Sequence, residues 1–342
     1  MIPLSVLDLS PIVSGGSAAE ALRNSVDLAR RAEALGYHRY WVAQHHLTPG
    51  VAAAAPSVLT AVIAGATERI RVGSAAVLLG YISPVVAAEQ FGTIAHLHPD
   101  RVDLGLGRSG TAKLAEVVGK VPNAQLTVWE QLNRILIPVD AGSYFEQVRA
   151  ILDFVDGTGE HHAVTAEHAR LQVWIHGSTP GESARVAGAL GLPFGAAYHF
   201  APGAAFDAIA AYREAFVPSQ RLAEPYVAVT ADVVVAETAS AARELASGYG
   251  QWVLSVRSGT GAQPYPSPAE AAAFPWTERL RDSVVGRVDT QFVGAPEEVA
   301  AGLEELRAKA DADEVVVTTI AHDHDARVRS YELLAQAWGT PG

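Results

Sequence analysis

The sequence of 342 residues contains no cysteine. Disulfide bonds, cysteine-ligated metal centres and thiol nucleophiles are therefore excluded for this chain. Hydrophobic residues make up 49% of the sequence, so apolar material for a large core is ample. A stable fold therefore needs no covalent cross-link to explain it.

Positive charge is also scarce. Lys and Arg total 25 against 37 Asp and Glu, which gives a formal net charge of -12. Lysine occurs only as Lys113, Lys120 and Lys309, so arginine carries most of the positive charge and few lysines could serve as catalysts. The acidic balance argues against nucleic acid or an anionic membrane as the main partner.

Long hydrophobic runs are missing as well. No apolar stretch reaches membrane-spanning length without glycine, proline or charge. Met1 leads directly into an apolar run from Pro3, with no basic segment and no small-residue cleavage site typical of a signal peptide. We therefore expect a cytoplasmic protein without a membrane partner.

Short apolar runs alternate with amphipathic stretches along the chain, which is typical of βαβ units and a parallel sheet. Eight runs predict strands, at 4–9, 38–43, 70–79, 102–106, 171–175, 194–198, 226–235 and 314–320. Eight such units favour an α/β fold of the (β/α)8 TIM-barrel type, as a single domain over residues 1–342. An open, doubly wound sheet is the alternative.

Two capping patterns mark predicted helix starts. Ser17 and Glu20 have capping-box spacing for a helix that reaches about Leu35. Thr179 and Glu182 have the same spacing, with a proline at the first helical position between them. We therefore predict helices that begin after Ser17 and after Thr179.

Two insertions interrupt the alternation, one after the predicted fourth strand and one before the eighth. The pattern weakens over 110–142, and a long helix is predicted over 239–256. The stretch 258–288 is rich in proline and glycine and predicts irregular structure, which is either a surface insertion or, by the family resemblance described below, a mobile lid.

The stretch 102–110 runs from an apolar strand into glycines at 105, 107 and 110, with Arg108 among them. It matches the dinucleotide-binding pattern G-x-G-x-x-G, but it lies in the fourth βα unit, before irregular sequence, and lacks the expected acidic partner on a second strand. An arginine in such a turn can offer a fork of donors to a phosphate. The alternative for Arg108 is a surface ion pair, to Asp103 or Glu116.

A second phosphate-binding feature follows the fifth strand, which neighbours the fourth in a barrel. There Ser178 precedes a predicted helix N-terminus, whose free N–H groups attract anions. Together with Arg108 this predicts a phosphate clamp. Two points oppose it: barrel phosphate sites more often follow the seventh and eighth strands, and Glu182 would repel an anion if it turned inward.

Other polar side chains also follow predicted strands, at the rim where barrel active sites lie. These are Ser10, His45, His46, Tyr81, His176, His199, His322, Asp323 and His324. The histidines allow a metal-dependent hydrolase as an alternative function. That alternative lacks the His-x-His expected after the first strand.

Small residues fill the predicted third strand, from Gly73 to Ala76. They would let a flat ring system lie against the barrel mouth. They are equally suited to filling a tapering barrel.

Several segments in this order and spacing resemble the bacterial luciferase-like flavin monooxygenases. The likeness runs from the first predicted strand to the last helix. The segments that carry it are 40–46 (YWVAQHH), 72–79 (VGSAAVLL), 101–108 (RVDLGLGR), 173–178 (VWIHGS), 190–195 (LGLPFG) with 199–200 (HF), and 292–299 (FVGAPEEV).

The resemblance implies a role for particular residues. It implies that His45 lies at the reactive face of the flavin as the catalytic residue, and that Arg108 and Ser178 bind the flavin phosphate. It places a non-prolyl cis peptide at Ala75–Ala76, beneath the flavin ring. The complete implied cofactor-binding set is Ala75, Ala76, Arg108, Gly177, Ser178 and Gly181.

The resemblance also implies the reaction. Reduced FMN, supplied by a separate NAD(P)H:flavin reductase, would activate O2 through a C4a-peroxyflavin and insert one oxygen atom into a hydrophobic, aromatic or polyketide-like substrate of secondary metabolism. It implies a homodimer paired through the early helices. Gly107 and Gly177 stand where luciferase itself has cysteine and glutamate, so light emission is not implied. An F420-dependent oxidoreductase of the same fold and a non-catalytic flavin-binding protein are the alternatives.

Overall fold

Eight parallel strands close into a barrel in the computed structural model, which describes residues 2–108, 135–136 and 141–340. In barrel order they are β10 (Glu314–Thr318), β1 (Leu4–Asp8), β2 (Arg39–Val42), β3 (Arg71–Ser74), β5 (Val102–Gly107), β6 (Leu171–Gly177), β7 (Phe194–Ala196) and β8 (Val227–Val235). Strand β8 pairs with β10 in parallel over five residues, from Ala228 beside Glu314, and this closes the ring. The predicted TIM barrel is confirmed, and the open sheet is wrong.

Two short strands lie beside this ring. β4 (Val77–Leu78) follows a cis peptide bond between Ala75 and Ala76 and pairs with β5. The cis peptide stands where the resemblance placed it. β9 (Phe292–Gly294), which no sequence pattern indicated, pairs with the carboxyl end of β8.

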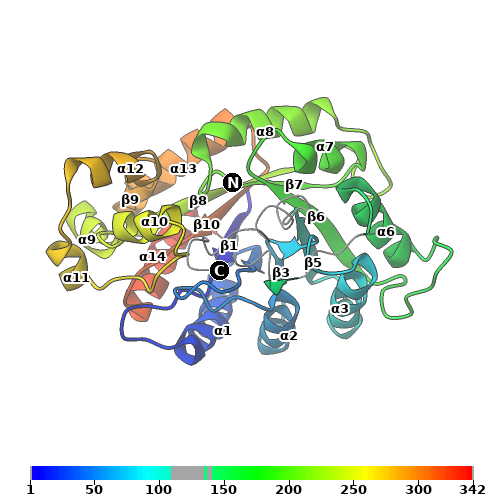
Figure 1. Ribbon diagram of the computed structural model, residues 1–342, viewed down its shortest axis with the longest axis horizontal. Coiled ribbons are helices and arrows are strands. Elements are labelled where there is room, and N and C mark those ends of the chain that lie inside the picture. The colour runs from blue at the N-terminus through cyan, green and yellow to red at the C-terminus, as the bar shows by residue number, and fades with distance from the viewer. Residues whose placement is uncertain (1, 109–134, 137–140, 341–342) are drawn as a thin grey trace.

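Helices surround the barrel (Figure 1). Those of the regular βα units are α1 (Ala18–Ala34), α2 (Pro56–Ala66), α3 (Pro84–Leu97), α6 (Tyr144–Asp156), α7 (Glu182–Ala189), α8 (Pro202–Glu214), α13 (Pro296–Ala310) and α14 (His324–Trp338). Among the described residues, no helix combines the length and the hydropathy that crossing a membrane requires.

The predicted capping box at α1 is confirmed. The Ser17 side chain accepts a hydrogen bond from the Glu20 backbone N–H, and the Glu20 carboxylate accepts one from the Ser17 N–H. The helix ends at Leu35, and Gly36 follows with a φ of 77° that favours glycine.

Three predictions of local structure are wrong. The predicted helix over 239–256 is two helices, α9 (Ala239–Leu245) and α10 (Tyr249–Arg257), broken at Gly248. The predicted irregular stretch 258–288 contains α11 (Pro268–Ala273) and α12 (Glu278–Val288), because Ser267 and Thr277 cap helices after its prolines. Helix α7 begins at Glu182, and its N-cap residue is Gly181 rather than Thr179. The insertion predicted over 110–142 lies largely outside the described residues.

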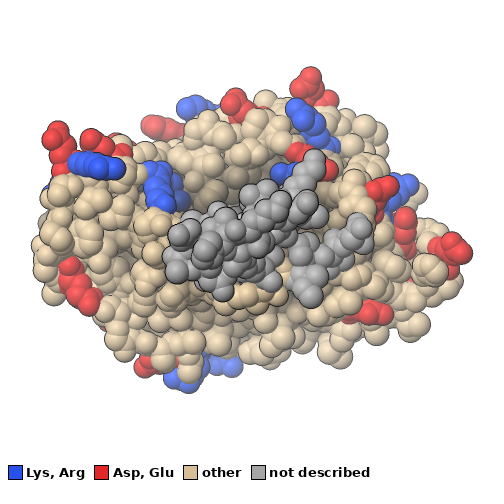
Figure 2. Space-filling model, viewed as in Figure 1, with Lys and Arg blue, Asp and Glu red and all other residues tan. Residues whose placement is uncertain are grey.

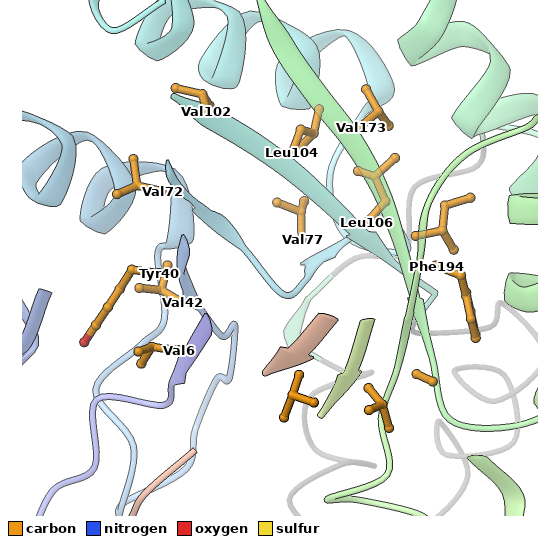
Figure 3. Packing of buried hydrophobic residues seen from close by; sticks show 14 of the residues in the cluster. Val6, Tyr40, Val42, Val72, Val77, Val102, Leu104, Leu106, Val173 and Phe194 are labelled. Carbon is orange, nitrogen blue, oxygen red and sulfur yellow. The ribbon is translucent and has the colours of Figure 1, made fainter. Parts of the chain in front are cut away.

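Successive residues of the barrel strands alternate between two cores. Tyr40 and Val173 belong to the large cluster that the strands share with the surrounding helices (Figure 3). Their neighbours Trp41 and Trp174 belong to a second cluster. Because side chains alternate along a strand, this second set points into the barrel.

The barrel interior also holds a buried ion-pair network. The Arg39 guanidinium on β2 donates from Nη1 to Asp103 on β5 at 2.8 Å and from Nε to Glu314 on β10 at 2.7 Å. Arg71 on β3 donates from Nη2 to Asp103 at 2.5 Å, and the Trp41 indole donates to the same carboxylate at 2.9 Å. Non-adjacent strands are thereby tied across the barrel.

Replacing Arg39 tests this network. Arg39→Met leaves Asp103 and Glu314 buried without their shared cation, so the free energy of unfolding should fall by about 3–5 kcal/mol in urea titrations. Arg31→Met is the matched control, because Arg31 forms only an exposed pair with Asp27. It should cost less than about 1 kcal/mol.

The wild type and Arg39→Met should also differ in how their stability depends on acidic pH. Burial raises the pKa of Asp103, but Arg39 and Arg71 outweigh burial and hold it below 3.8. The stability that these ion pairs contribute is fully present above the pKa of Asp103 in the unfolded chain. It is lost as the pH falls through the lower pKa of Asp103 in the folded protein. The wild type should therefore lose stability below about pH 4 more steeply than Arg39→Met. A steeper acid loss in the variant would contradict this account.

Candidate active site

A cavity of about 650 Å³ opens at the carboxyl ends of the barrel strands. Residues from β5, β6, the segments after β2 and β7, and the α10–α12 region line it. The residues of the site predicted from sequence that line it are His45, Ala75, Ala76, Arg108, Gly177 and Ser178. The barrel therefore brings these six together in one place.

His45 follows β2 and is open to this cavity. Its backbone N–H donates to the Ala53 carbonyl at 2.8 Å, which fixes the loop. Partial desolvation by the cavity walls, and then neighbouring His46, lower the pKa of His45 below its ordinary value. At neutral pH the imidazole is uncharged and able to accept a proton.

The cis peptide at Ala75–Ala76 is held between neighbouring segments. The Ala75 N–H donates to the Val42 carbonyl on β2 at 2.8 Å. The Gln44 side chain accepts from the Leu78 N–H at 3.0 Å, just beyond it. A Cβ on Gly107 would lie 3.1 Å from the Ala76 Cβ, so glycine lets β5 approach this step closely.

Arg108 follows β5 at the cavity rim. Its Nη1 donates to the Glu182 carboxylate at 2.8 Å, and both side chains are partly exposed, at 52% and 39%. Of the ion pairs considered from sequence, the one to Asp103 is wrong, because Asp103 points into the barrel toward Arg39 and Arg71. Glu116 lies outside the described residues.

The N-terminus of α7 lies beside Arg108. Gly181 is its N-cap residue and offers no side-chain cap, and Ser178 precedes it at the cavity. The capping box predicted at Thr179 is wrong, because the Glu182 carboxylate pairs with Arg108 instead. Gly181 itself is not among the residues that line the cavity. This corner combines a cation, a hydroxyl and uncapped N–H groups, which are the groups that bind phosphate.

His176, at the end of β6, forms part of the cavity floor. Its ring lies edge-on to Trp41 at a centroid distance of 4.9 Å, and its buried Nε2 has no hydrogen-bond partner within the described parts of the chain. Burial outweighs the attraction of Asp103 and lowers its pKa to about 3.

Glycines make room for this imidazole. A Cβ on Gly105 would collide with the Ser74 carbonyl and lie 2.6 Å from the His176 Nε2, and a Cβ on Gly195 would collide with Nδ1. The first glycine of the apparent dinucleotide motif thus serves close packing inside the barrel.

His199, after β7, faces the same cavity. Its Nδ1 lies 2.5 Å from the Thr230 hydroxyl. Burial, then Arg287, lower its pKa to about 3. His45, His176 and His199 are thus all neutral at physiological pH.

Two other predicted rim histidines lie elsewhere. His322 contacts the Ser14 carbonyl at 3.1 Å and His324 contacts Asp27 at 3.1 Å. In the described ranges, no three His, Asp or Glu side chains are placed to hold a metal ion. The metal-dependent hydrolase therefore has no ligand cluster in that part of the chain.

Sequence analysis named none of the residues of one wall of the cavity, although part of this wall lies in the stretch 258–288. It comes from α10, α12 and the loop between α10 and α11, and it includes Trp252, Val256, Ala262 and Arg287. In Figure 1 these helices lie together on one side of the barrel. The signal available in the sequence was Arg287, near the end of the amphipathic stretch 278–288. The prolines and glycines before this stretch favoured a loop instead.

A model of the luciferase-like monooxygenase family matches residues 2–314. The chain belongs to this family. It is 42% identical over 337 residues to the protein YvbT of Bacillus subtilis (strain 168), covering 98% of this chain and 96% of that protein. It is 37% identical over 335 residues to the luciferase-like monooxygenase of Escherichia coli (strain K12), covering 97% and 96%. The chain is accordingly a luciferase-like oxidoreductase, as the resemblance implied.

Solved structures agree with this family membership. The structure of apo-MsnO8 has a TM-score of 0.85 at 30% identity and covers 100% of this chain and 99% of that chain. Two more distant likenesses show the fold alone. A type II Baeyer-Villiger monooxygenase component of Pseudomonas putida in complex with FMN is 19% identical, with a TM-score of 0.66 and 98% of each chain covered. An F420-dependent secondary alcohol dehydrogenase is 15% identical, with a TM-score of 0.67, covering 98% of this chain and 99% of that chain. A shorter match joins 109 residues, 32% of this chain and 33% of the relative, at 46% identity to the N-acetyl-S-alkylcysteine monooxygenase of Bacillus subtilis (strain 168).

The packing of His176 makes a prediction about Gly105. Gly105→Ala should lower the thermal stability and disturb near-ultraviolet circular dichroism, because the new methyl group collides with Ser74 backbone and displaces the imidazole from Trp41. We expect a loss of about 2 kcal/mol or more. The matched control is Gly65→Ala in α2, where a Cβ meets nothing within 4 Å. It should stabilise by up to about 1 kcal/mol. Equal effects of the two substitutions would refute the packing role.

Proposed function

We propose that the chain is a two-component monooxygenase that receives reduced FMN from a separate NAD(P)H-dependent reductase. It would insert one oxygen atom of O2 into a hydrophobic substrate. The observation that carries the proposal is that one cavity contains the Ala75–Ala76 cis peptide, the neutral His45 and the corner of Arg108 and Ser178.

The residues of this cavity fit FMN. Arg108, Ser178 and the uncapped start of α7 would bind the phosphate, with Gly177 and Gly181 keeping the corner free of side chains. Ala75 and Ala76 would lie beneath the ring. Glu182 is the one opposing group, because it holds Arg108 and would have to give way to the phosphate. Reduced FMN, when bound, supplies the electrons that make O2 reactive.

His45 is assigned to proton transfer next to the reacting oxygen. The imidazole is uncharged at neutral pH, so one of its two ring nitrogens carries no proton. That nitrogen can accept a proton or hold a hydrogen-bond donor in place. The wall from α10 and α12 would restrict water at the site, which suits a reaction whose competing outcome is release of hydrogen peroxide.

The remaining wall indicates the substrate class. It is apolar over Leu7, Leu9, Val51 and Val256, with the aromatic rings of Phe200 and Trp252 beside it. We place an aromatic, polyketide-like molecule first. The partial match to an N-acetyl-S-alkylcysteine monooxygenase makes a thioether the second class.

Two alternatives use the same cavity. An F420-dependent oxidoreductase has the same barrel, and equilibrium binding of F420 with no binding of FMN would favour it. A non-catalytic flavin-binding protein would bind FMN without changing how reduced FMN reacts with O2.

We also propose a homodimer. The exposed apolar side chains of α1 and α2, Leu22, Val58 and Val62, border a shallow apolar hollow and offer a surface for a second copy. Charged side chains of both signs are scattered along the edge of the face drawn in Figure 2, so its described part shows no extended basic surface for nucleic acid.

Arg108 and Glu182 should affect FMN binding in opposite directions. Arg108→Ala should weaken FMN binding about 30–100-fold, because the phosphate loses a charged donor. Glu182→Gln should tighten it about 2–5-fold, because a competing carboxylate is removed. Flavin-fluorescence titration measures both, with Arg185→Ala on the exposed face of α7 as the control. Unchanged affinity in Arg108→Ala would exclude its phosphate role.

His45→Ala should change the reaction with O2 and leave FMN binding intact. With reduced FMN bound, we expect the wild type to delay hydrogen peroxide release behind O2 consumption. The variant should shorten that delay about tenfold or more, because proton control is lost. Stopped-flow absorbance and a peroxide assay measure it, and His322→Ala, outside the cavity, is the control. A delay that persists in His45→Ala would remove this residue from the chemistry.

A further inference from the structure

Two N–H donors on the wall formed by α10 and α12 have no hydrogen-bond partner among the described residues. They are the Arg287 Nε and the Trp252 Nε1. Both side chains line the cavity, and each is at least nine-tenths buried, with 7% of its surface exposed. Each group is a donor only, so a hydrogen-bond acceptor is the partner that would complete it. An unmade hydrogen bond of this kind is costly, which points to a ligand that completes it.

The rest of the Arg287 guanidinium is fixed by its neighbours. Its Nη2 donates to the Tyr249 hydroxyl at 2.8 Å and to the Asp232 carboxylate at 3.2 Å, and Tyr249 also donates to Asp232. The Tyr249 ring stacks on Trp252 at a centroid distance of 6.1 Å. Tyr249 therefore connects both donors into one rigid frame.

Asp232 leaves part of the guanidinium free. Asp232 and Tyr249 each accept from Nη2 and use both of its hydrogens, so the Nε–H is the guanidinium donor that these contacts leave for a ligand. The other nearby titratable groups are the neutral His199, His45 and His176. Beside Arg287 the cavity thus combines a buried cation, an unpaired indole N–H and no second carboxylate from this wall.

Apolar surface continues from these donors. Val256 and Ala262 line the same wall, and the Phe200 ring centroid lies 5.8 Å from the Arg287 guanidinium carbon. Arg108, where we place the flavin phosphate, lines the cavity from the position after β5, whereas Arg287 lies on α12. The donors therefore serve a second polar group, on a ligand with an apolar body.

We propose that Arg287 and Trp252 bind the carboxylate of an organic acid whose apolar part lies against Phe200, Val256 and Ala262. The substrate class is then an aliphatic or aromatic carboxylic acid. That this acid is the molecule oxidised rests on the function proposed above, whereas its binding does not.

The test compares acids with their neutral amides in the flavin-free protein. Octanoate and 3-phenylpropionate, and the primary amide of each, are titrated by calorimetry. The wild type should bind each acid about 30-fold more tightly than its amide, as expected for a hydrogen bond to a charged group. Trp252→Phe, which removes only the indole N–H, should reduce this preference several-fold, and Arg287→Met should abolish it. Arg281→Met, an exposed arginine on the same helix, should leave it unchanged.

Two further measurements keep the result decisive. Arg287→Met strands the buried Asp232, so the double variant Arg287→Met/Asp232→Asn restores neutrality and should fold with the preference still absent. FMN affinity is measured for every variant and should be unchanged. Equal affinity of the wild type for acids and amides, including no measurable binding of either, would overturn the proposal. A parallel loss of FMN affinity in Trp252→Phe would instead assign these donors to the flavin.

The outcome is separable from that of the proposed function. Acid preference is measured without flavin or O2, so it can hold even when FMN fails to bind or the O2 reaction is unchanged. Conversely, a flavin-dependent oxygenation with no acid preference would retain the function and reject the acid site.

Discussion

The structure depends most on the ion pairs that Arg39 makes inside the barrel. Its guanidinium, on β2, joins Asp103 on β5 and Glu314 on β10. Arg71 on β3 pairs with the same Asp103. Above it the Trp41 indole donates to Asp103, and the guanidinium carbon lies 4.7 Å from the Trp174 ring centroid. The His176 imidazole packs on Trp41 and meets the cavity. The floor of the site is thus built in layers on a buried charge.

This layering explains the electrostatics of the site. The layers below His176 bury its imidazole, and burial lowers the pKa values of His176 and of His199 to about 3. Among the described residues that line the cavity, two arginines supply positive charge, and each is held by a partner, Arg108 by Glu182 and Arg287 by Asp232. Arg108 follows β5 and Arg287 lies on α12, so the two charges come from different elements of the fold.

Sequence patterns predicted the barrel because its strands obey local rules. Apolar runs between amphipathic stretches identified all eight ring strands, and the capping box of α1 needed only residues three positions apart. The family resemblance added the cis peptide at Ala75–Ala76, which composition does not show. The roles of Asp103 and Gly105 were not predictable, because both depend on groups from other strands that are far away in the sequence. Arg287 was missed because the capping of α12 by Thr277 is hidden behind a run of prolines and glycines.

At the proposed phosphate site, the Arg108–Glu182 pair would turn anion binding into an exchange. A phosphate that arrived would replace a carboxylate, and the carboxylate could return as the phosphate left. The arginine is never left without a counter-charge, so departure of the anion meets a lower electrostatic barrier than it would at an isolated cation. For the proposed two-component monooxygenase, which would take up and release its cofactor at every turnover, such a returning anion would favour fast exchange of the cofactor over tight retention.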